Sequence, residues 1–298
     1  MRHFYRDYNQ YARKMLSFAR RVHGYRWRTI VLFLRAEEKR LRMKKTVSHL
    51  SDFQHEWEHN INFLLGGECV PFAYDFPPVA TLVDVLRRDP ECRIQRGGYQ
   101  GKKDTTDISA AFRALPIEQA LATRFSVAHF KLDRFFGPGQ ILHDFEARVL
   151  EPWRALLRRA GFEWERCYPI LFISGPNTGT HYHMDFSHVV AWQIYGTKVF
   201  SGLRDPDRFE PIENAVKKSH HESLIMPATI TPEDTLAYAM NPGDVLWNQL
   251  LTPHWVDATN EVAVSLNISH GMLRRNGKLC PNEQRVEDWW RAHPEEAW

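Results

Sequence analysis

The chain has few cysteines and no long apolar run. Its 298 residues include only four cysteines, Cys69, Cys92, Cys167 and Cys280, and no CxxC pair. Such spacing excludes a disulfide scaffold and a zinc knuckle, and it favours a reducing compartment. The run at residues 30–34 is far shorter than the roughly 20 apolar residues that span a bilayer. The sequence therefore predicts a cytoplasmic protein without a transmembrane segment.

Acidic residues are scarce at the start of the chain. The first 45 positions hold 14 Lys/Arg and 3 Asp/Glu, so the overall charge of +3 hides a basic start and an acidic remainder. Apolar residues recur there at helical spacing, at Tyr8, Ala12, Met15, Ala19 and Val22. We predict a basic amphipathic helical extension over residues 1–46. It suits an acidic partner, an anionic surface, or the acidic remainder of this chain or of a second subunit.

Histidine and aspartate occur in strand-like patterns in the second half of the chain. A strand over residues 180–185 would place the side chains of His183 and Asp185 on one face, with Tyr182 and Met184 on the other. Residues 241–247 predict a turn that leads into a strand, and His254 follows. Residues 261–270 alternate like a further half-buried strand. Two imidazoles and one carboxylate can hold Fe(II) and leave coordination positions free.

The residues from His183 to Lys198, with the Pro242–Val245 turn and the later His254, resemble the JmjC (jumonji-C, cupin-like) Fe(II)/2-oxoglutarate oxygenases. The resemblance extends over residues 168–270. It implies a mainly β fold with flanking helices (α+β) around a double-stranded β-helix (jelly-roll/cupin) core. It also implies Fe(II) ligands at His183, Asp185 and His254, with O2 as a co-substrate.

The same resemblance implies how 2-oxoglutarate binds. Lys198 matches the lysine that pairs with the distal carboxylate of 2-oxoglutarate, which is chemically sensible because a buried carboxylate is costly unless it is paired. Thr180 matches a hydroxyl residue that assists, and Asn267 matches a polar position that lines the co-substrate pocket. The chain departs from some members at Val189, where they have an asparagine four residues after the aspartate ligand, here Asp185.

The implied activity is a 2-oxoglutarate-dependent dioxygenase that hydroxylates a protein or peptide side chain. A free or carrier-bound amino acid or a natural-product intermediate is the alternative substrate. A non-catalytic cupin-like protein that binds metal or a partner is the alternative from a different class. Demethylation ranks lower, because nothing in the sequence resembles a histone-reading module.

Composition and periodicity place further segments around the predicted core at residues 167–275. With 43% hydrophobic and 13% aromatic residues, the chain is not disordered. Residues 47–166 predict a helix-rich buttress. Its helices are expected at 108–115, 117–124 and 140–160. Residues 276–298 predict a C-terminal helix that either covers the barrel or forms a homodimer contact.

Other motifs compete with this interpretation. Residues 55–59 satisfy the HExxH pattern of zinc hydrolases, but their polar setting favours a charged helical surface. Residues 97–103 resemble a phosphate-binding loop, but Lys103 stands where Ser or Thr is required, which favours a surface loop. His181 shares the predicted face of the ligands and could approach the pocket. The polar insertion at residues 205–240 could act as a lid or a substrate wall.

Overall fold

A computed structural model of the chain describes residues 45–59, 61–212 and 225–296. Contacts between Cα atoms divide the chain into two units, Met1–Lys45 and Thr46–Trp298, and nearly all described residues belong to the second. The basic extension predicted over residues 1–46 lies almost entirely outside the described residues, so its helix and its partner stay predictions. The described residues include no helix with the length and apolar character needed to cross a membrane.

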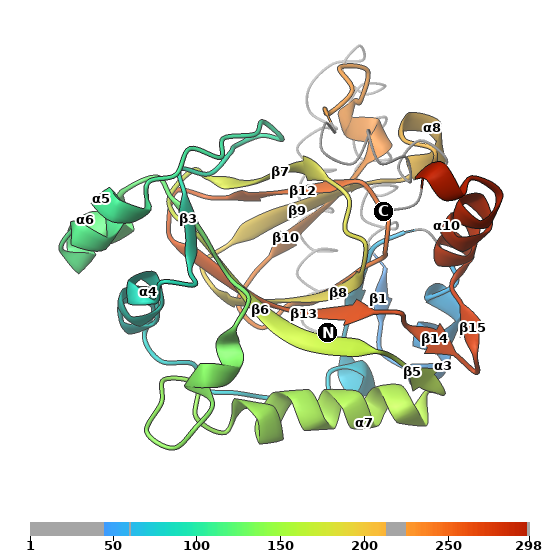
Figure 1. Cartoon of the computed structure of the whole chain (residues 1–298), viewed down its shortest axis with the longest axis horizontal. Helices are drawn as coiled ribbons and strands as arrows, with labels where there is room; N and C mark the ends of the chain where they lie inside the picture. The colour runs from blue at the N-terminus through green and yellow to red at the C-terminus, as the bar shows by residue number, and fades with distance from the viewer. Residues whose placement is uncertain (1–44, 60, 213–224, 297–298) are drawn as a thin grey trace, which may run out of the picture. The chain divides into compact units, whose positions relative to one another are not determined.

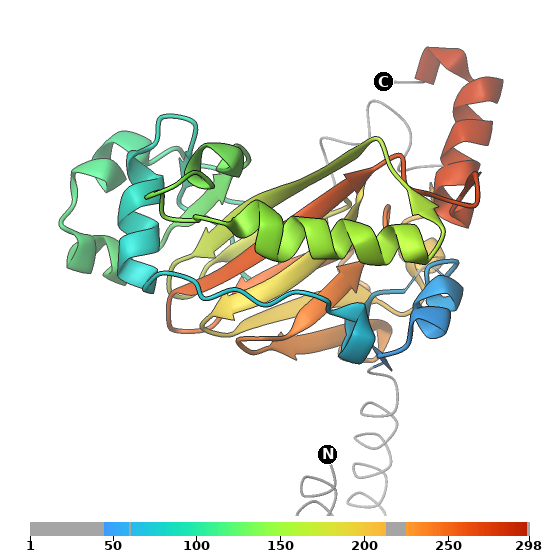
Figure 2. The same cartoon turned by 90° about the horizontal axis from the view of Figure 1, so that it is seen from below.

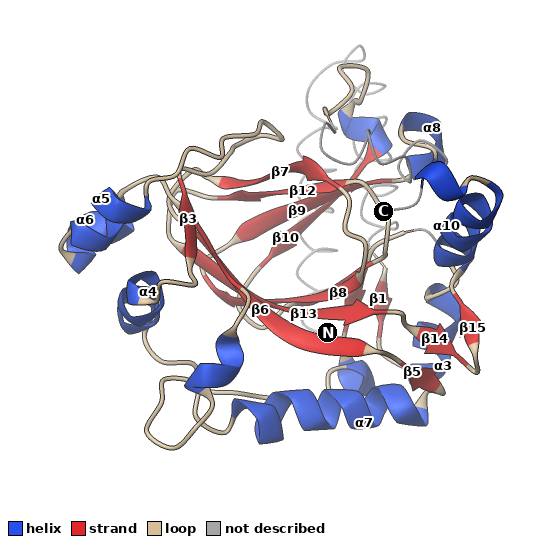
Figure 3. Ribbon diagram, viewed as in Figure 1, coloured by secondary structure: helices blue, strands red, loops and turns tan. Residues whose placement is uncertain are grey.

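Strands dominate the described part, and helices surround them (Figure 3). The strands are β1 (Thr46–Val47), β2 (Phe63–Leu65), β3 (Arg93–Gln95), β4 (Ser126–His129), β5 (Phe162–Glu163), β6 (Arg166–Ser174), β7 (Gly179–His183), β8 (His188–Tyr195), β9 (Lys198–Leu203), β10 (Thr235–Met240), β11 (Val245–Asn248), β12 (His254–Ala258), β13 (Ala263–Gly271), β14 (Arg274–Arg275) and β15 (Lys278–Leu279). The α-helices are α3 (Leu50–Glu56), α4 (Val79–Arg88), α5 (Ser109–Ala114), α6 (Ile117–Ala122), α7 (Glu151–Arg159), α8 (Pro206–Phe209) and α10 (Pro281–Ala292).

Two larger sheets form the body of this unit (Figure 1). The eight-stranded sheet has the order β1-β2-β11-β8-β13-β6-β4-β3, and the four-stranded sheet has the order β10-β9-β12-β7. A small third sheet has the order β15-β14-β5. All pairings are antiparallel except that of β1 with β2. The prediction of a fold with large β-sheets and flanking helices is confirmed at this level.

Successive residues of the central strands face two different environments. In β8, Val190, Trp192 and Ile194 belong to the largest hydrophobic core, whereas Ala191 and Gln193 between them line a pocket. This is the period of two that a strand imposes on its side chains. The same division holds in β13, with core residues Val264, Leu266 and Ile268 and pocket residues Ser265 and Asn267. One sheet therefore supports both the core and the pocket.

The largest core lies where α3 and α7 pack on the eight-stranded sheet. Figure 2 shows α7 crossing the face of this sheet. Trp153 and Leu156 of α7 are fully buried there, together with Phe53 of α3 and Trp247 of β11. The Trp153 indole N–H donates a hydrogen bond of 2.7 Å to Nε2 of the buried His270. The helix is thus joined to β13 by a polar contact as well as by apolar packing.

The region between residues 47 and 166 contains the predicted helices but also contributes strands. Helices α5 and α6 lie within the predicted ranges 108–115 and 117–124. The predicted helix at 140–160 begins only at Glu146, with one π-helical turn that continues as α7. Pro152 is the second residue of α7, directly after the π-helical turn, so the irregular turn and the proline occur together. Strands β1 to β4 extend the main sheet. Each has only two to four residues, too few for a sequence pattern of alternating polar and apolar residues.

The later segments also follow the predicted order. The turn expected at residues 241–247 closes with a 2.8 Å hydrogen bond from the Asn241 N–H to the Asp244 carboxylate, and β11 follows it. The strand expected at 261–270 is β13. The insertion at 205–240 is not wholly polar loop, because its last residues form β10, which pairs with β9. The predicted C-terminal helix is α10.

Replacing Trp153 with Ala tests the packing of α7. The change removes a fully buried indole and leaves His270 Nε2 without its donor, so we expect a loss of about 3–5 kcal/mol in the free energy of unfolding. Denaturant titration measures the loss. Arg159→Ala on the exposed face of α7 is the control and should change the free energy by no more than about 0.5 kcal/mol. Equal stability of the two variants would contradict this account of the core.

Candidate metal and carboxylate site

His183 and His254 lie opposite each other on neighbouring strands. His183 is the last residue of β7, His254 is the first residue of β12, and the two are cross-strand partners in the antiparallel register. Their ring centroids are 4.2 Å apart. Nε2 of each ring lies 3.6 Å from an oxygen of Asp185, on Oδ1 for His183 and Oδ2 for His254. One nitrogen from each histidine and a carboxylate oxygen thus surround a common point.

Asp185 reaches this point from a loop, which corrects the prediction of one strand over residues 180–185. Strand β7 ends at His183, and the backbone of Asp185 is held instead by the Leu251 N–H, which donates to its carbonyl at 2.9 Å. His183 and Asp185 still face the pocket, and Tyr182 and Met184 still point away from it, as predicted. Tyr182 and Met184 are buried in two other hydrophobic clusters, away from the pocket.

The close approach of β7 to β12 depends on Gly179. A Cβ atom at this position would lie 1.8 Å from the carbonyl oxygen of Val256, which no side chain can tolerate. The pairing also shifts register between His254 and Val256, as in a β-bulge. A glycine opposite an irregular strand is a recurrent way to bring two backbones together. Here it brings the strands of the two histidines into one ladder.

The free edge of β7 is covered by the loop at residues 97–103. Gly98 forms a bridge with Gly179, and the Tyr182 N–H donates to the Gly101 carbonyl at 3.3 Å. The Gln100 N–H also donates to the Asp257 carboxylate at 2.6 Å. The segment resembling a phosphate loop therefore covers the edge of β7 and holds the strand of His183 in place.

Backbone carbonyls fix which ring nitrogen of His183 and of His254 faces Asp185 without a proton when the ring is neutral. Nδ1 of His183 lies 2.7 Å from the His181 carbonyl, and Nδ1 of His254 lies 2.9 Å from the Thr252 carbonyl. A carbonyl can only accept, so in each neutral ring the proton sits on Nδ1 and the lone pair on Nε2. Burial lowers the pKa of His183 to about 4, with His254 acting in the same direction and Asp185 opposing it. At neutral pH this imidazole is ready to bind a cation.

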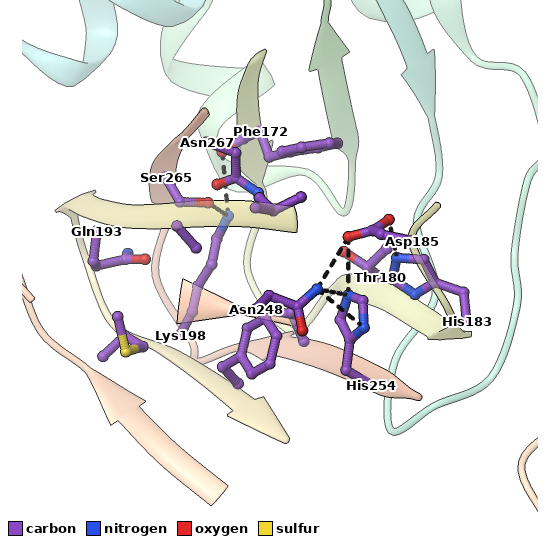
Figure 4. Close-up of a pocket in the computed structure, with 15 residues that line it drawn as sticks. Phe172, Thr180, His183, Asp185, Gln193, Lys198, Asn248, His254, Ser265 and Asn267 are labelled. Atoms are coloured by element: carbon purple, nitrogen blue, oxygen red, sulfur yellow. Dashed lines mark hydrogen bonds and ion pairs between the residues drawn. The ribbon is translucent and has the colours of Figure 1, made fainter. Parts of the chain in front are cut away.

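Asn248 at the end of β11 is a site residue that sequence reasoning missed. Its amide Nδ2 donates to Oδ2 of Asp185 at 3.1 Å and lies 3.4 Å from the ring nitrogens of His254 (Figure 4). Asn248 is the cross-strand partner of Val189, the position where some JmjC members have an asparagine. The amide thus enters this pocket from the neighbouring strand. Two-residue periodicity with Leu246 is the signal that could have found it.

Lys198 occupies another part of the same pocket. Its side chain is buried, and Nζ donates to Oγ of Ser265 at 2.9 Å and to the carbonyl of Phe172 at 3.2 Å. Among the residues that the structure describes, no acidic side chain forms an ion pair with it. Burial lowers the pKa of Lys198 to about 7. A carboxylate ligand would supply the missing counter-charge, because a buried cation is costly when unpaired.

The structure brings all six sequence-predicted site residues to one pocket, where their roles as ligands stay predictions. The six are Thr180, His183, Asp185, Lys198, His254 and Asn267. Asn267 lies next in phase after Ser265 on β13, and its buried carbonyl oxygen Oδ1 has no hydrogen-bond partner. Gln193 and Asn248 add further amides to the pocket lining. The pocket combines a cluster of metal-binding groups, a buried ammonium and several amides.

Two other histidine motifs lie outside this pocket. The ring of His181 is 5.5 Å from that of His183, and burial lowers the pKa of His181 to about 4, with smaller contributions from His183 and Lys103. In the HExxH segment, α3 ends at Glu56, and both histidines, His55 and His59, are exposed. The HExxH residues therefore do not lie along one continuous α-helix as the zinc hydrolase pattern requires, although the ligand atoms of His55, Glu56 and His59 lie within 4.8 Å of one another on the surface.

No protein-family model and no curated protein matches this chain. Among solved structures, similarity is found to YcfD of Escherichia coli, described as a ribosomal oxygenase. One YcfD structure has a TM-score of 0.46 and 17% identity over 76% of this chain and 53% of that chain. Another, with cobalt and 2-oxoglutarate, has a TM-score of 0.41 and 17% identity over 74% of this chain and 50% of that one. The chain spans about half the length of these proteins, and likeness at this level carries no inference about activity.

Replacing Asp185 with Ala tests whether the cluster binds a divalent cation. Mn(II) suits imidazole and carboxylate ligands. We expect the variant to bind Mn(II) much more weakly, because the change removes the only carboxylate of the cluster. Electron paramagnetic resonance of free Mn(II) measures binding. Asn248→Ala should weaken binding less, by about 10–100-fold, since it only orients the carboxylate. His181→Ala is the control, and a loss there equal to that of Asp185→Ala would contradict the assignment.

Proposed function

We propose that this chain is an Fe(II)- and 2-oxoglutarate-dependent oxygenase with a double-stranded β-helix core, and that it hydroxylates a protein or peptide side chain. The observation that carries the proposal is the pocket itself. It combines two histidines and one aspartate with a buried lysine that has no acidic partner among the described residues. The first group suits a metal ion, and the second suits the far end of a dicarboxylate.

The residues present fit Fe(II). Two neutral imidazoles and one carboxylate form the donor set of non-haem iron oxygenases, and the ligand atoms of His183, Asp185 and His254 all lie within 4.8 Å of one another. Fe(II) held by these three residues would supply the free coordination positions for a ketoacid and O2, and the oxidising chemistry. The protein supplies the orientation. The carbonyls of His181 and Thr252 fix the ring tautomers, and Asn248 holds the carboxylate.

The polar groups around Lys198 fit the distal carboxylate of 2-oxoglutarate. The ammonium already donates to Ser265 and to a backbone carbonyl, so it is held in position before the ligand arrives. In Figure 4 Lys198 lies apart from the cluster of His183, Asp185 and His254, on the side of the pocket where Ser265 and Gln193 are drawn. A dicarboxylate could thus place its keto-acid end at the cluster and its other end at Lys198. Thr180 and Asn267 line the same pocket and would contact the ligand between these ends.

The cluster of His183 and Asp185 is more exposed to solvent than Lys198. The side chain of Asp185 is 31% exposed and that of His183 is 24% exposed, whereas Lys198 is 3% exposed. The co-substrate would therefore occupy the inner end, and the substrate would approach the cluster from the surface. A side chain on a protein or peptide needs to insert only its tip to reach such a site. A free or carrier-bound amino acid is the competing substrate class, and turnover with peptide and amino acid pools distinguishes them.

Anaerobic titration of the Fe(II)-loaded chain with 2-oxoglutarate tests the proposal. Formation of the chelate is expected to produce a weak visible charge-transfer band. Lys198→Met keeps the length and burial of the side chain but removes the charge, so 2-oxoglutarate affinity should fall by at least about 30-fold, as for the loss of one partner of a buried ion pair. Under air, the same variant should release less succinate from 2-oxoglutarate.

Lys131→Met is the matched control, since this lysine is 59% exposed and pairs with Glu91. It should bind 2-oxoglutarate like the parent chain. Absence of the band despite bound Fe(II) would overturn the proposal and favour a cupin-like metal-binding protein without this activity. If Lys198→Met gave a band of equal strength, the metal site would still stand, but Lys198 would have no role in binding 2-oxoglutarate.

The pH dependence of 2-oxoglutarate binding follows from the lowered pKa of Lys198. Because burial lowers it to about 7 in the unliganded chain, the side chain is an ammonium below that pH and loses its proton above it. A carboxylate binds the protonated form, so affinity should be constant below pH 7 and fall by about tenfold per pH unit above it. Isothermal titration calorimetry in buffers of different ionisation enthalpy would show proton uptake at pH 8. Affinity that is unchanged from pH 6 to 9 would contradict this assignment.

A further inference from the structure

A second cluster of metal-binding groups lies where α10 begins. It consists of His188 at the start of β8, Cys280 just before α10, and Glu283 in the first turn of α10. A ring nitrogen, the thiol sulfur and a carboxylate oxygen of these residues all lie within 4.8 Å of one another. All three residues are buried, with His188 and Cys280 at 0% exposure and Glu283 at 7%. None of them lines the pocket described above.

The cluster leaves two buried polar atoms without a hydrogen bond. Nε2 of His188 and Oε2 of Glu283 are 3.9 Å apart, which is too long for a hydrogen bond, and neither atom has a hydrogen-bond partner among the described residues. Buried polar atoms are almost always paired, since an unpaired one costs about 1–3 kcal/mol. Nδ1 of His188 lies 3.4 Å from the Leu250 N–H and can only accept there, which leaves the proton of a neutral ring on the orphaned Nε2.

We infer that His188, Cys280 and Glu283 form a second metal site, separate from the histidine–aspartate cluster, that takes Zn²⁺. A nitrogen, a sulfur and a carboxylate oxygen are the donors that Zn²⁺ combines in proteins. With bonds of about 2.0–2.3 Å, tetrahedral ligand atoms lie about 3.3–3.8 Å apart, so the cluster has to contract by up to about 1.5 Å. Three protein ligands leave the fourth position to a water molecule.

The charges of the donor groups suit a divalent ion. A bound Zn²⁺ would displace the thiol proton, and any carboxyl proton, to solvent, and one thiolate with one carboxylate would cancel its charge. Coordination through Nε2 of His188 requires the ring proton on Nδ1, so it gives up the long 3.4 Å contact with the Leu250 N–H.

The cluster joins α10 to the segment that carries Asp185. Met184, Leu250 and Val286 belong to one hydrophobic cluster at this contact, and Asn282 donates to the Leu250 carbonyl at 3.1 Å. A metal bound by His188 and by two residues of the start of α10 would hold the C-terminal helix against the loop between β7 and β8. The site is structural in this sense, and its existence does not depend on the proposed oxygenase activity.

Co(II) binding tests the site, because a cysteine thiolate bound to cobalt gives a near-ultraviolet charge-transfer band that histidine and carboxylate ligands do not give. The experiment uses the whole chain with His183→Ala, Asp185→Ala and His59→Ala, which disables the first cluster and the exposed HExxH segment. We expect the thiolate band and one Zn²⁺ per chain after desalting. Adding Cys280→Ala should abolish both, and Glu283→Gln should weaken Zn²⁺ binding by at least tenfold in a chelator competition.

Cys69→Ala, which removes a buried thiol outside the cluster, is the matched control and should keep the band. Circular dichroism establishes that each variant is folded. If Cys280→Ala fails to fold, the measurement rests on Glu283→Gln and on thermal unfolding, where Zn²⁺ should raise Tm reversibly with EDTA. A folded parent without a thiolate band, or a band that survives Cys280→Ala, would overturn the inference and assign the cluster to a hydrogen-bonded network or bound water.

Discussion

The candidate site depends above all on the antiparallel pairing of β7 with β12. That register places His183 opposite His254, although the two residues are far apart in the sequence. Gly179 permits the two backbones to approach, and the loop at residues 97–103 covers the outer edge of β7. A slip of one residue would move the side chain of one histidine to the other face of its strand. The pairing of β7 with β12 therefore positions the two histidines, more than any single side chain does.

A second constraint is that one sheet serves both a core and a pocket. Alternate residues of β8, β11 and β13 pack under α7 or line the pocket, so the helix indirectly positions the polar residues on the opposite face. Asn248 and Ser265 are fixed in this way, because Trp247 and Val264 beside them are fully buried. Rigid strands hold site residues more accurately than loops do. Asp185 is the exception, and it is held by hydrogen bonds to its backbone and side chain.

Local periodicity was sufficient to predict strands at residues 180–185, 241–247 and 261–270, and it placed His183 and Asp185 on one face. The other pocket residues, Lys198, Thr180 and Asn267, came from the resemblance to the JmjC oxygenases. The sequence was insufficient where tertiary contacts decide. Strands β1 to β4 are too short to show alternation, and they form because the eight-stranded sheet offers them partners. Asn248 was missed because its role depends on pairing with Val189 across β8. The loop position of Asp185 likewise depends on a contact with Leu251, which spacing alone cannot show.

The two ends of the pocket suit ligands of opposite charge. The cluster of His183, Asp185 and His254 offers two ring nitrogens and a carboxylate oxygen to a cation, whereas Lys198 is a buried amine that a carboxylate would hold in its charged form. Neither Asp185 nor Lys198 pairs with the other. A metal ion with a dicarboxylate bound to it would satisfy both ends at once, since the ion neutralises the aspartate and the far carboxylate neutralises the lysine. Each ligand would then favour binding of the other, because coupling between two sites is reciprocal.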